Sequence, residues 1–171
     1  MLVMLIGYRG SGKTTVGRRL ASDLWYGFCD TDSLIAQRQG KTIAELFRES
    51  GEQAFRDIES EVVRECCTLK DHVVALGGGA VIRELNRRLL RQSGAKVFYL
   101  RCDPAELIRR IQADPASAAN RPPLTPLGDS VEEVHRVLSE REAQYREVAG
   151  GELDVTRLTV EEAARYLARM L

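Results

Sequence analysis

Hydrophobic residues follow two patterns that alternate along the chain. Apolar residues that recur every three or four positions predict helices, and the shorter runs between them predict strands. Strands that alternate with helices indicate a parallel sheet covered on both faces. The sequence therefore predicts one α/β domain over residues 1–171. The expected strands lie at 2–6, 27–32, 72–76, 95–100 and 153–155, and the second of them runs into two acids.

The helices that this pattern predicts begin at recognisable N-terminal signals. A Ser, Thr or Asp that precedes an apolar stripe can cap a helix, and a Glu or Gln three residues later completes a capping box. Pro suits the first helical position. These signals are Thr42-x-x-Glu45, Ser50-x-x-Gln53, Asp103-Pro104 and Thr159-x-x-Glu162, and further helices are expected at about 83–93 and 129–148.

One segment, residues 114–128, breaks the alternation. It holds four of the five prolines together with Gly128. Loops longer than about 12 residues are usually functional or mobile. We therefore expect a functional loop here.

Composition limits the possible functions. The chain has 171 residues, 29% of them charged and 44% hydrophobic, which is typical of a globular domain. A net charge of zero argues against a general nucleic-acid or membrane surface. No apolar run approaches 18 residues, and the N-terminus does not resemble a signal peptide. The four cysteines show neither metal-ligand spacing nor a disulfide framework, so we expect a cytoplasmic protein.

The strongest motif is Gly7-Tyr8-Arg9-Gly10-Ser11-Gly12-Lys13-Thr14, which fits the phosphate-binding pattern G-x-x-x-x-G-K-[ST]. It follows a predicted strand and precedes a helical stripe of Val16, Leu20 and Leu24. Glycines let the backbone wrap an anion, and the helix dipole adds to the attraction. We expect Gly10, Ser11, Gly12, Lys13, Thr14 and Thr15 to bind a nucleoside triphosphate, with Lys13 on the β- and γ-phosphates and Thr14 on Mg²⁺.

Two further groups follow predicted strands. Residues two apart in an extended strand project to the same side, so Asp30 and Asp32 would leave one strand on one face. One acid could hold Mg²⁺, and the other could accept a proton from a substrate hydroxyl. Gly77, Gly78 and Gly79 indicate a wall along which a ligand approaches the backbone. An Asp-rich turn and a flexible glycine turn are the structural alternatives.

Arginine far outnumbers lysine, so only an arginine in an unusual position is informative. Arg141 lies on the stripe of Leu138 and Tyr145, where a charge needs a partner. That partner is either a protein carboxylate or an anionic ligand. Arg56 adjoins another apolar stripe, and Glu59 could orient it. Arg121, in the proline-rich loop, could cover a bound phosphate or simply face solvent.

Taken together, these residues resemble the shikimate kinase family from Leu5 to about Leu167. The resemblance implies a nucleoside-monophosphate-kinase-like fold, a three-layer α/β/α arrangement with a five-stranded parallel sheet. The segment from Ala113 to Asn120 is longer than in compact members of that family. The resemblance rests on Gly7–Thr14, Asp30-Thr31-Asp32, Phe55-Arg56-x-x-Glu59, Gly77–Gly79, Arg121-Pro122 and Arg141-x-x-x-Tyr145-x-x-x-Ala149.

The resemblance also implies roles. Asp32 would hold the substrate hydroxyls and serve as a candidate base, and Asp30 would lie near Mg²⁺. The shikimate carboxylate would bind Arg56 and Arg141, with Gly77 to Gly79 along the ring. Arg121 would reach the transferring phosphoryl group from a lid at about 113–128, the acceptor would bind an insertion at about 31–62, and Arg110 and Arg157 would flank adenine.

The prediction is thus an ATP-dependent kinase that makes shikimate 3-phosphate for aromatic amino-acid biosynthesis, with small-molecule partners, no nucleic acid or membrane, and a monomeric state. A gluconate kinase is the alternative within the class. A GTPase switch would need an Asn-Lys-x-Asp guanine reader, which the sequence lacks. A motor ATPase would end a strand directly in an acid pair, and the strand before Gly77 ends in glycines instead.

Overall fold

The structure, a computed structural model, describes residues 1–114 and 131–171. Its centre is a five-stranded sheet in the order β2-β3-β1-β4-β5, and every paired strand is parallel. This confirms the predicted sheet. The strands are β1 (Leu2–Ile6), β2 (Gly27–Asp30), β3 (His72–Ala75), β4 (Lys96–Arg101) and β5 (Gly151–Asp154).

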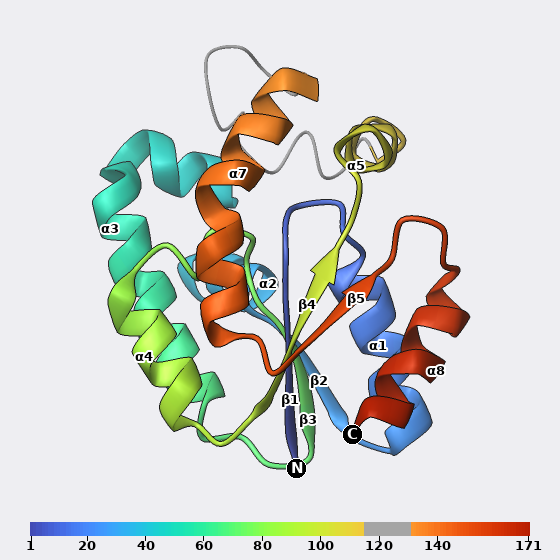
Figure 1. Cartoon of the computed structure of the whole chain (residues 1–171). Coiled ribbons are helices and arrows are strands. Elements are labelled where there is room, and N and C mark those ends of the chain that lie inside the picture. Colours follow the sequence, from blue (N-terminus) through green and yellow to red (C-terminus); the bar gives the residue numbers. More distant parts are fainter. Residues whose placement is uncertain (115–130) are drawn as a thin grey trace.

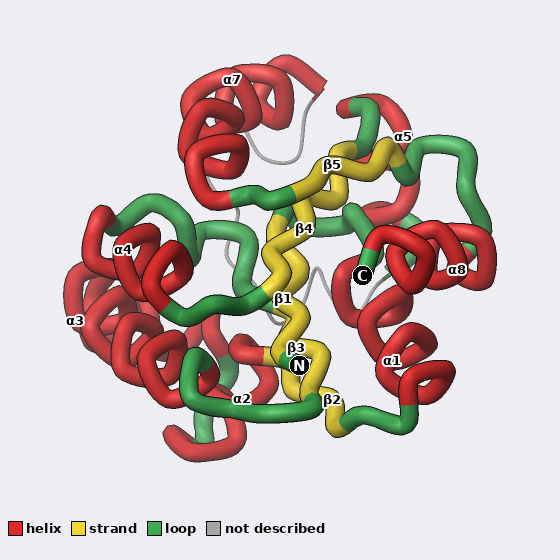
Figure 2. The backbone as a smooth tube through the Cα atoms, turned by 60° about the horizontal axis from the view of Figure 1, so that its bottom comes forward, coloured by secondary structure: helices red, strands yellow, loops and turns green. Residues whose placement is uncertain are grey.

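Helices cover both faces of the sheet and complete three layers (Figure 2). In Figure 1, α3 and α4 lie on one side of the strands and α1 and α8 on the other. None of the described helices is long and apolar enough to cross a membrane. The described helices are α1 (Lys13–Leu24), α2 (Thr31–Gln39), α3 (Ile43–Cys66), α4 (Glu84–Gln92), α5 (Pro104–Gln112), α7 (Val131–Val148) and α8 (Val160–Met170).

Strand alternation divides the core into two clusters. Met4 and Ile6 of β1 point into the cluster that α3 and α4 cover, whereas Val3 and Leu5 point into the one beneath α1 and α8. Each of these four side chains is at most 1% exposed. A strand buried on both faces is the reason why β1 appears in the sequence as an unbroken apolar run.

Helix α7 belongs to both clusters. Its N-terminal half packs against α5 and places Val134 in the cluster that also contains residues of α1 and α8, and its C-terminal half packs Tyr145 and Val148 into the other cluster. Arg141 lies between these two halves and is only half-buried. The predicted apolar stripe on this helix is therefore present. Arg141 lies on it between the residues that belong to one cluster and those that belong to the other.

Three of the predicted helix starts are confirmed. Thr42 and Thr159 form complete capping boxes with Glu45 and Glu162. The Asp103 side chain caps α5 and accepts a hydrogen bond from the Ala105 amide at 2.9 Å. These caps satisfy backbone amides that have no partner within the helix.

The sequence prediction missed helix α2 and is wrong in two details. The strand predicted at 27–32 ends at Asp30, because the Asp30 carboxylate caps α2 by accepting a hydrogen bond from the Ser33 amide at 3.0 Å. The helix break predicted at Ser50 lies at Gly51, whose φ of 79° and ψ of 167° interrupt α3. Glycine tolerates that positive φ, so it marks the break better than the serine before it.

Because all the paired strands are parallel, their carboxyl ends share one edge of the sheet. In open α/β sheets this edge is where ligands bind. The segments that leave it are the glycine loop after β1, Asp30 after β2, Gly77–Gly79 after β3 and Val155 after β5. The fold thereby brings the sequence motifs to one place.

Candidate active site

The glycine loop between β1 and α1 has a backbone that only glycine adopts readily. Gly10 and Gly12 have φ values of 82° and 89°. A side chain at Gly10 would also meet Ile111 of α5, since an added Cβ would lie 3.0 Å from its Cγ1 atom. The Lys13 ammonium donates hydrogen bonds to the Gly7 and Tyr8 carbonyls, both at 2.8 Å. Lys13 thus lies folded across the loop that is predicted to hold phosphates.

Thr14 and Asp30 meet directly. The Thr14 hydroxyl donates a 2.6 Å hydrogen bond to Asp30 Oδ2, while Asp30 Oδ1 accepts from the Ser33 amide. One carboxylate therefore joins the start of α1 to the start of α2. Within residues 1–114 and 131–171 no three His, Cys, Asp or Glu side chains gather as metal ligands. A metal ion at Thr14 and Asp30 would need further oxygen ligands from a substrate or water, which suits Mg²⁺.

A large cavity of about 980 Å³ opens at this edge of the sheet. We call it the larger cavity. The glycine loop and the start of α1, from Gly10 to Val16, line it together with Asp30 and Asp32. Further lining residues come from α5 and from the segment between β5 and α8. They are Arg110, Ile111, Asp114, Val155, Leu158, Thr159, Val160 and Ala163.

The two arginines predicted to flank adenine differ in position. Arg110 lines the larger cavity, and its guanidinium donates to Glu106 at 2.7 Å and to the Val155 carbonyl at 2.9 Å. These contacts tie α5 to the segment after β5. Arg157 is exposed and does not line the cavity, although Leu158 beside it does. The structure therefore places Arg110 at the cavity and Arg157 outside its lining.

A smaller cavity, of about 70 Å³, adjoins the larger one. Asp32, Ile43 and Gly78 line both cavities, so the two spaces meet at these residues. Predicted acceptor residues make up much of the remaining wall. The full lining is Tyr8, Arg9, Asp32, Ile43, Phe47, Phe55, Arg56, Glu59, Gly78, Gly79 and Arg141.

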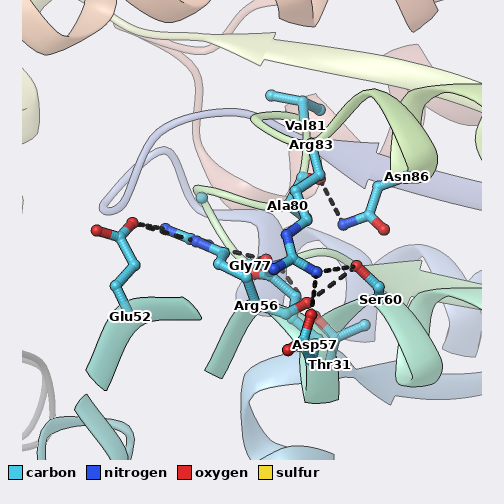
Figure 3. Close-up of polar contacts among 12 residues, drawn as sticks. Thr31, Glu52, Arg56, Asp57, Ser60, Gly77, Ala80, Val81, Arg83 and Asn86 are labelled. Carbon is cyan, nitrogen blue, oxygen red and sulfur yellow. Dashed lines mark hydrogen bonds and ion pairs between the residues drawn. The ribbon is translucent and has the colours of Figure 1, made fainter. Parts of the chain in front are cut away.

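Arg56 is a tightly held cation of the smaller cavity. Its guanidinium donates to Glu59 at 2.8 Å and to Glu52 at 3.2 Å, the contact drawn in Figure 3. The Phe55 ring centroid lies 5.4 Å away. Burial lowers the pKa of Arg56, but the nearby charges of Glu59 and Glu52 outweigh it and raise the pKa overall. A permanent positive charge is therefore held at this wall.

Glu59 is almost fully buried, with 1% of the residue exposed. Burial raises the pKa of its carboxyl group, and the Arg56 guanidinium opposes that rise. An ion pair with so little water around it fixes both side chains, because breaking it would leave an uncompensated buried charge. The predicted orienting role of Glu59 is consistent with this geometry.

The glycines after β3 leave room for charged groups. A Cβ at Gly77 would lie 2.4 Å from Asp32 Oδ1, and one at Gly79 would lie 2.5 Å from Arg56 Nη1. Either distance is far below van der Waals contact. A side chain at Gly77 would displace the Asp32 carboxylate, and one at Gly79 would displace the Arg56 guanidinium, so glycine at these two positions leaves both charged groups in place.

Hydrogen bonds hold this glycine segment in place. The Gly77 amide donates to the fully buried Thr31 hydroxyl at 2.9 Å. The Asn86 amide group donates to the Ala80 carbonyl, also at 2.9 Å (Figure 3). Thr31 lies between Asp30 and Asp32, so the segment that carries both acids also anchors the glycines.

Helix α7 supplies the last wall. The Tyr145 hydroxyl donates a 2.6 Å hydrogen bond to the Gly78 carbonyl, and Arg141 approaches the same oxygen at 3.4 Å. Tyr145 stacks on Tyr99 of β4 with ring centroids 4.9 Å apart. Arg141 thus contacts a backbone carbonyl at the smaller cavity, and no ion pair between it and a carboxylate is seen among the described residues.

The structure gathers most of the predicted site residues. Asp30, Asp32 and the glycine loop line the larger cavity, and Arg56, Arg141 and Gly79 line the smaller one. Gly77 lines neither cavity, but a Cβ added to it would collide with the Asp32 carboxylate. Arg121 and most of the predicted lid lie outside the described residues.

Sequence reasoning missed several residues of the smaller cavity. Arg9, 6% exposed, and Tyr8 belong to the variable positions of the phosphate-binding pattern, which carry no constraint of their own. Ile43 and Phe47 were expected only as members of an apolar stripe on α3. An arginine inside the loop, in a chain with two other inward arginines, was the one signal that could have revealed Arg9.

Comparisons with known proteins agree with this geometry. A family model described as shikimate kinase matches residues 9–171. Shikimate kinases from Mycobacterium avium and Thermobifida fusca are each 42% identical to the chain. The first alignment covers 98% of this chain and 92% of its relative, and the second covers 99% and 94%.

Solved structures give the same result. The structure of a shikimate kinase from Acinetobacter baumannii in complex with shikimate has a TM-score of 0.91 and 32% identity, covering 99% of this chain and 91% of that one. A gluconokinase from Sinorhizobium meliloti, at 19% identity and a TM-score of 0.57, shares the fold alone. The chain belongs to the shikimate kinase family.

Proposed function

We propose that this chain transfers the γ-phosphoryl group of ATP to the 3-hydroxyl of shikimate. One observation carries the proposal: the larger and smaller cavities meet at Asp32 and Gly78. Residues Gly10 to Thr15 of the phosphate-binding loop line the larger cavity, and Arg9, Arg56 and Arg141 line the smaller one. Phosphoryl transfer needs chiefly positioning and charge stabilisation, which this arrangement can supply.

The larger cavity would hold ATP. Residues Gly10 to Thr15 would surround the phosphates, and Lys13 would exchange its bonds to the Gly7 and Tyr8 carbonyls for bonds to phosphate oxygens. Arg110 is supported as an adenine-side residue because Glu106 and the Val155 carbonyl hold it at the cavity wall. Arg157 remains a prediction from the resemblance.

Mg²⁺ would bind at Thr14 and Asp30, whose oxygens are already in contact. Such an ion would neutralise charge on the β- and γ-phosphate oxygens. The protein contributes the hydroxyl and one carboxylate, and it fixes that carboxylate through the Ser33 amide. The nucleotide would supply the remaining charged ligands.

The smaller cavity would hold the acceptor. Arg56 and Arg141 come from different helices and line one small space, which suits a carboxylate. Asp32 stands at the junction of the cavities, where it can accept a hydrogen bond from a substrate hydroxyl and then take its proton. Most of this wall comes from within residues 31–62, the predicted acceptor-binding insertion.

The roles of Arg121 and of the lid, the monomeric state and the cytoplasmic location remain predictions from the sequence. Gluconate carries a carboxylate as well as hydroxyls, so two arginines alone do not distinguish it from shikimate. The family membership favours shikimate.

A coupled assay of ADP release across shikimate, gluconate and nucleoside monophosphates tests the proposal. The expected result is turnover with shikimate far above that with the other acceptors. A matched preparation with Lys13→Met controls for contaminating kinases. Efficient turnover with gluconate or a nucleotide, and none with shikimate, would reject the proposed acceptor.

A further inference from the structure

Two cysteines that are distant in the sequence lie in contact. Cys29 is on β2 and Cys66 is the last residue of α3, 37 positions later. Their sulfur atoms are 4.0 Å apart. Neither the phosphate-binding loop nor the smaller cavity includes them.

The other two cysteines lack this geometry. Cys67 follows Cys66 directly and is half-buried, and no sulfur contact is found for it in the described part of the chain. Cys102 packs in the opposite core, beneath α1 and α8, whereas Cys29 and Cys66 belong to the core under α3 and α4. The sheet thus separates Cys102 from the pair.

We propose that Cys29 and Cys66 form a reversible disulfide. An S–S bond of about 2.05 Å requires the two sulfur atoms to approach by roughly 2 Å, a distance within reach of side-chain rotation and small shifts at the end of a helix. Cys29 is half-buried, so an oxidant in solvent can approach its thiol. Cys66 is 2% exposed, so its thiol reacts only with Cys29.

The oxidant would be a small-molecule disulfide such as oxidised glutathione. The Cys29 sulfur, after its proton leaves to solvent, attacks one sulfur of the small disulfide and releases one glutathione thiol. The Cys66 sulfur, also deprotonated, then attacks the Cys29 sulfur of the mixed disulfide and releases the second thiol. Two protein thiols are oxidised, and one small disulfide is reduced to two thiols.

The bond would join two elements that support the active site. The segment immediately after Cys29 carries Asp30 and Thr31, and α3 carries Arg56 and Glu59. Because the loop closed by the bond spans 37 positions, the cross-link should reduce the entropy of the unfolded chain and raise the thermal midpoint. Simple packing of two small apolar side chains is the alternative.

Thiol counting and peptide mapping test the proposal directly. The full chain is equilibrated with mixtures of reduced and oxidised glutathione, quenched with acid, and alkylated under denaturing conditions. The expected result is the loss of two of the four thiols and a peptide that links Cys29 to Cys66 within one chain. Four free thiols in the most oxidising mixture, or a link that involves Cys67 or a second chain, would overturn the proposal.

The adjacent cysteines provide a matched pair of variants. Cys67→Ala should still form the bond, whereas Cys66→Ala should retain at most glutathione adducts. The oxidised wild-type protein should melt at a higher temperature than the reduced protein, and dithiothreitol should remove the difference. Should Cys66→Ala fold poorly, Cys29→Ala serves in its place. If oxidation raised the melting temperature of either variant as much as that of the wild type, the assignment would be contradicted.

Discussion

The two cavities of this protein are built in different ways. The phosphate-binding part of the larger cavity comes from one continuous stretch, Gly10–Val16, and the rest of its lining comes from α2, the start of α3, the segment after β3, α5 and the segment between β5 and α8. The smaller cavity is assembled from four places: the glycine loop, the β2–α2–α3 region, the turn after β3, and α7. A continuous motif can be identified in the sequence by itself, whereas an assembled wall can be identified only when the fold is known.

The difference extends to the energetics of the two sites. In the larger cavity, Lys13 contacts backbone carbonyls that it can exchange for phosphate. In the smaller one, Arg56 and Glu59 are locked together in the interior. A substitution in the smaller cavity should therefore lower both activity and stability. The loss of stability should be larger where the replaced side chain is more deeply buried.

The largest expected effect is at the junction of the cavities. Asp32→Asn should reduce kcat by about 10²–10⁴-fold, because the amide cannot take the hydroxyl proton. Affinity for ADP, measured by calorimetry, should change little. Asp23→Asn, an exposed acid paired with Arg19, is the control. Weakened nucleotide binding with normal acceptor kinetics would show that Asp32 belongs to the larger cavity alone.

Arg56 and Arg141 should respond differently to truncation. Arg56→Ala leaves Glu59 buried without its cation and should cost about 3–5 kcal/mol of unfolding free energy, together with acceptor binding. Arg141→Ala, at a half-buried position without an ion pair in the described structure, should raise the acceptor KM and leave the denaturation midpoint nearly unchanged. Urea unfolding and steady-state kinetics on both variants measure the contrast. Equal stability losses would mean that Arg141 is a structural cation.

A substitution at Thr31 tests whether the acceptor site needs the hydrogen bond between the Gly77 amide and the Thr31 hydroxyl. Thr31→Val removes the hydroxyl that accepts from the Gly77 amide, and a buried amide without a partner costs about 1–3 kcal/mol. The acceptor KM should rise while the KM for ATP stays constant. Thr31→Ser, which keeps the hydroxyl, should restore acceptor kinetics; an equal loss in both variants would indicate a packing effect instead.

The smallest effect is expected at Glu106, whose pKa is lowered from 4.5 to about 2 by hydrogen bonds from Arg109 and Arg110. A lowered pKa in the folded state adds stability that is present above pH 4.5 and lost as the pH falls toward 2. Glu106→Gln should therefore be slightly less stable than wild type at pH 7, and the gap should close in acid. Thermal midpoints of both proteins from pH 7 to pH 3 measure this difference in stability. A difference that does not change with pH would contradict the assignment.

The sequence was sufficient where the structural signal is local. The fold class, the glycine loop and the capping boxes at Thr42 and Thr159 are confirmed. Each depends on neighbouring residues, so a short pattern determines it. The family membership followed because several such patterns occur in one order along the chain.

The sequence was not sufficient where a residue's role depends on what lies beside it in space. Helix α2 was missed because it buries only Thr31 and Ile35, too few for an apolar period. Arg9 was missed because it occupies a position that the loop motif leaves variable. The exposure of Arg157 depends on the turn between β5 and α8, which no local pattern specifies.

The central claim is that the smaller cavity recognises a carboxylate through Arg141 and presents a hydroxyl to Asp32. The most direct measurement compares kcat/KM for shikimate with that for its carboxamide, in the wild type and in Arg141→Ala. Losing one partner of a buried charge pair costs about 2–5 kcal/mol, so the wild type should prefer shikimate by roughly 30-fold or more. The variant should lose most of that preference. A preference that is unchanged in Arg141→Ala would contradict the account.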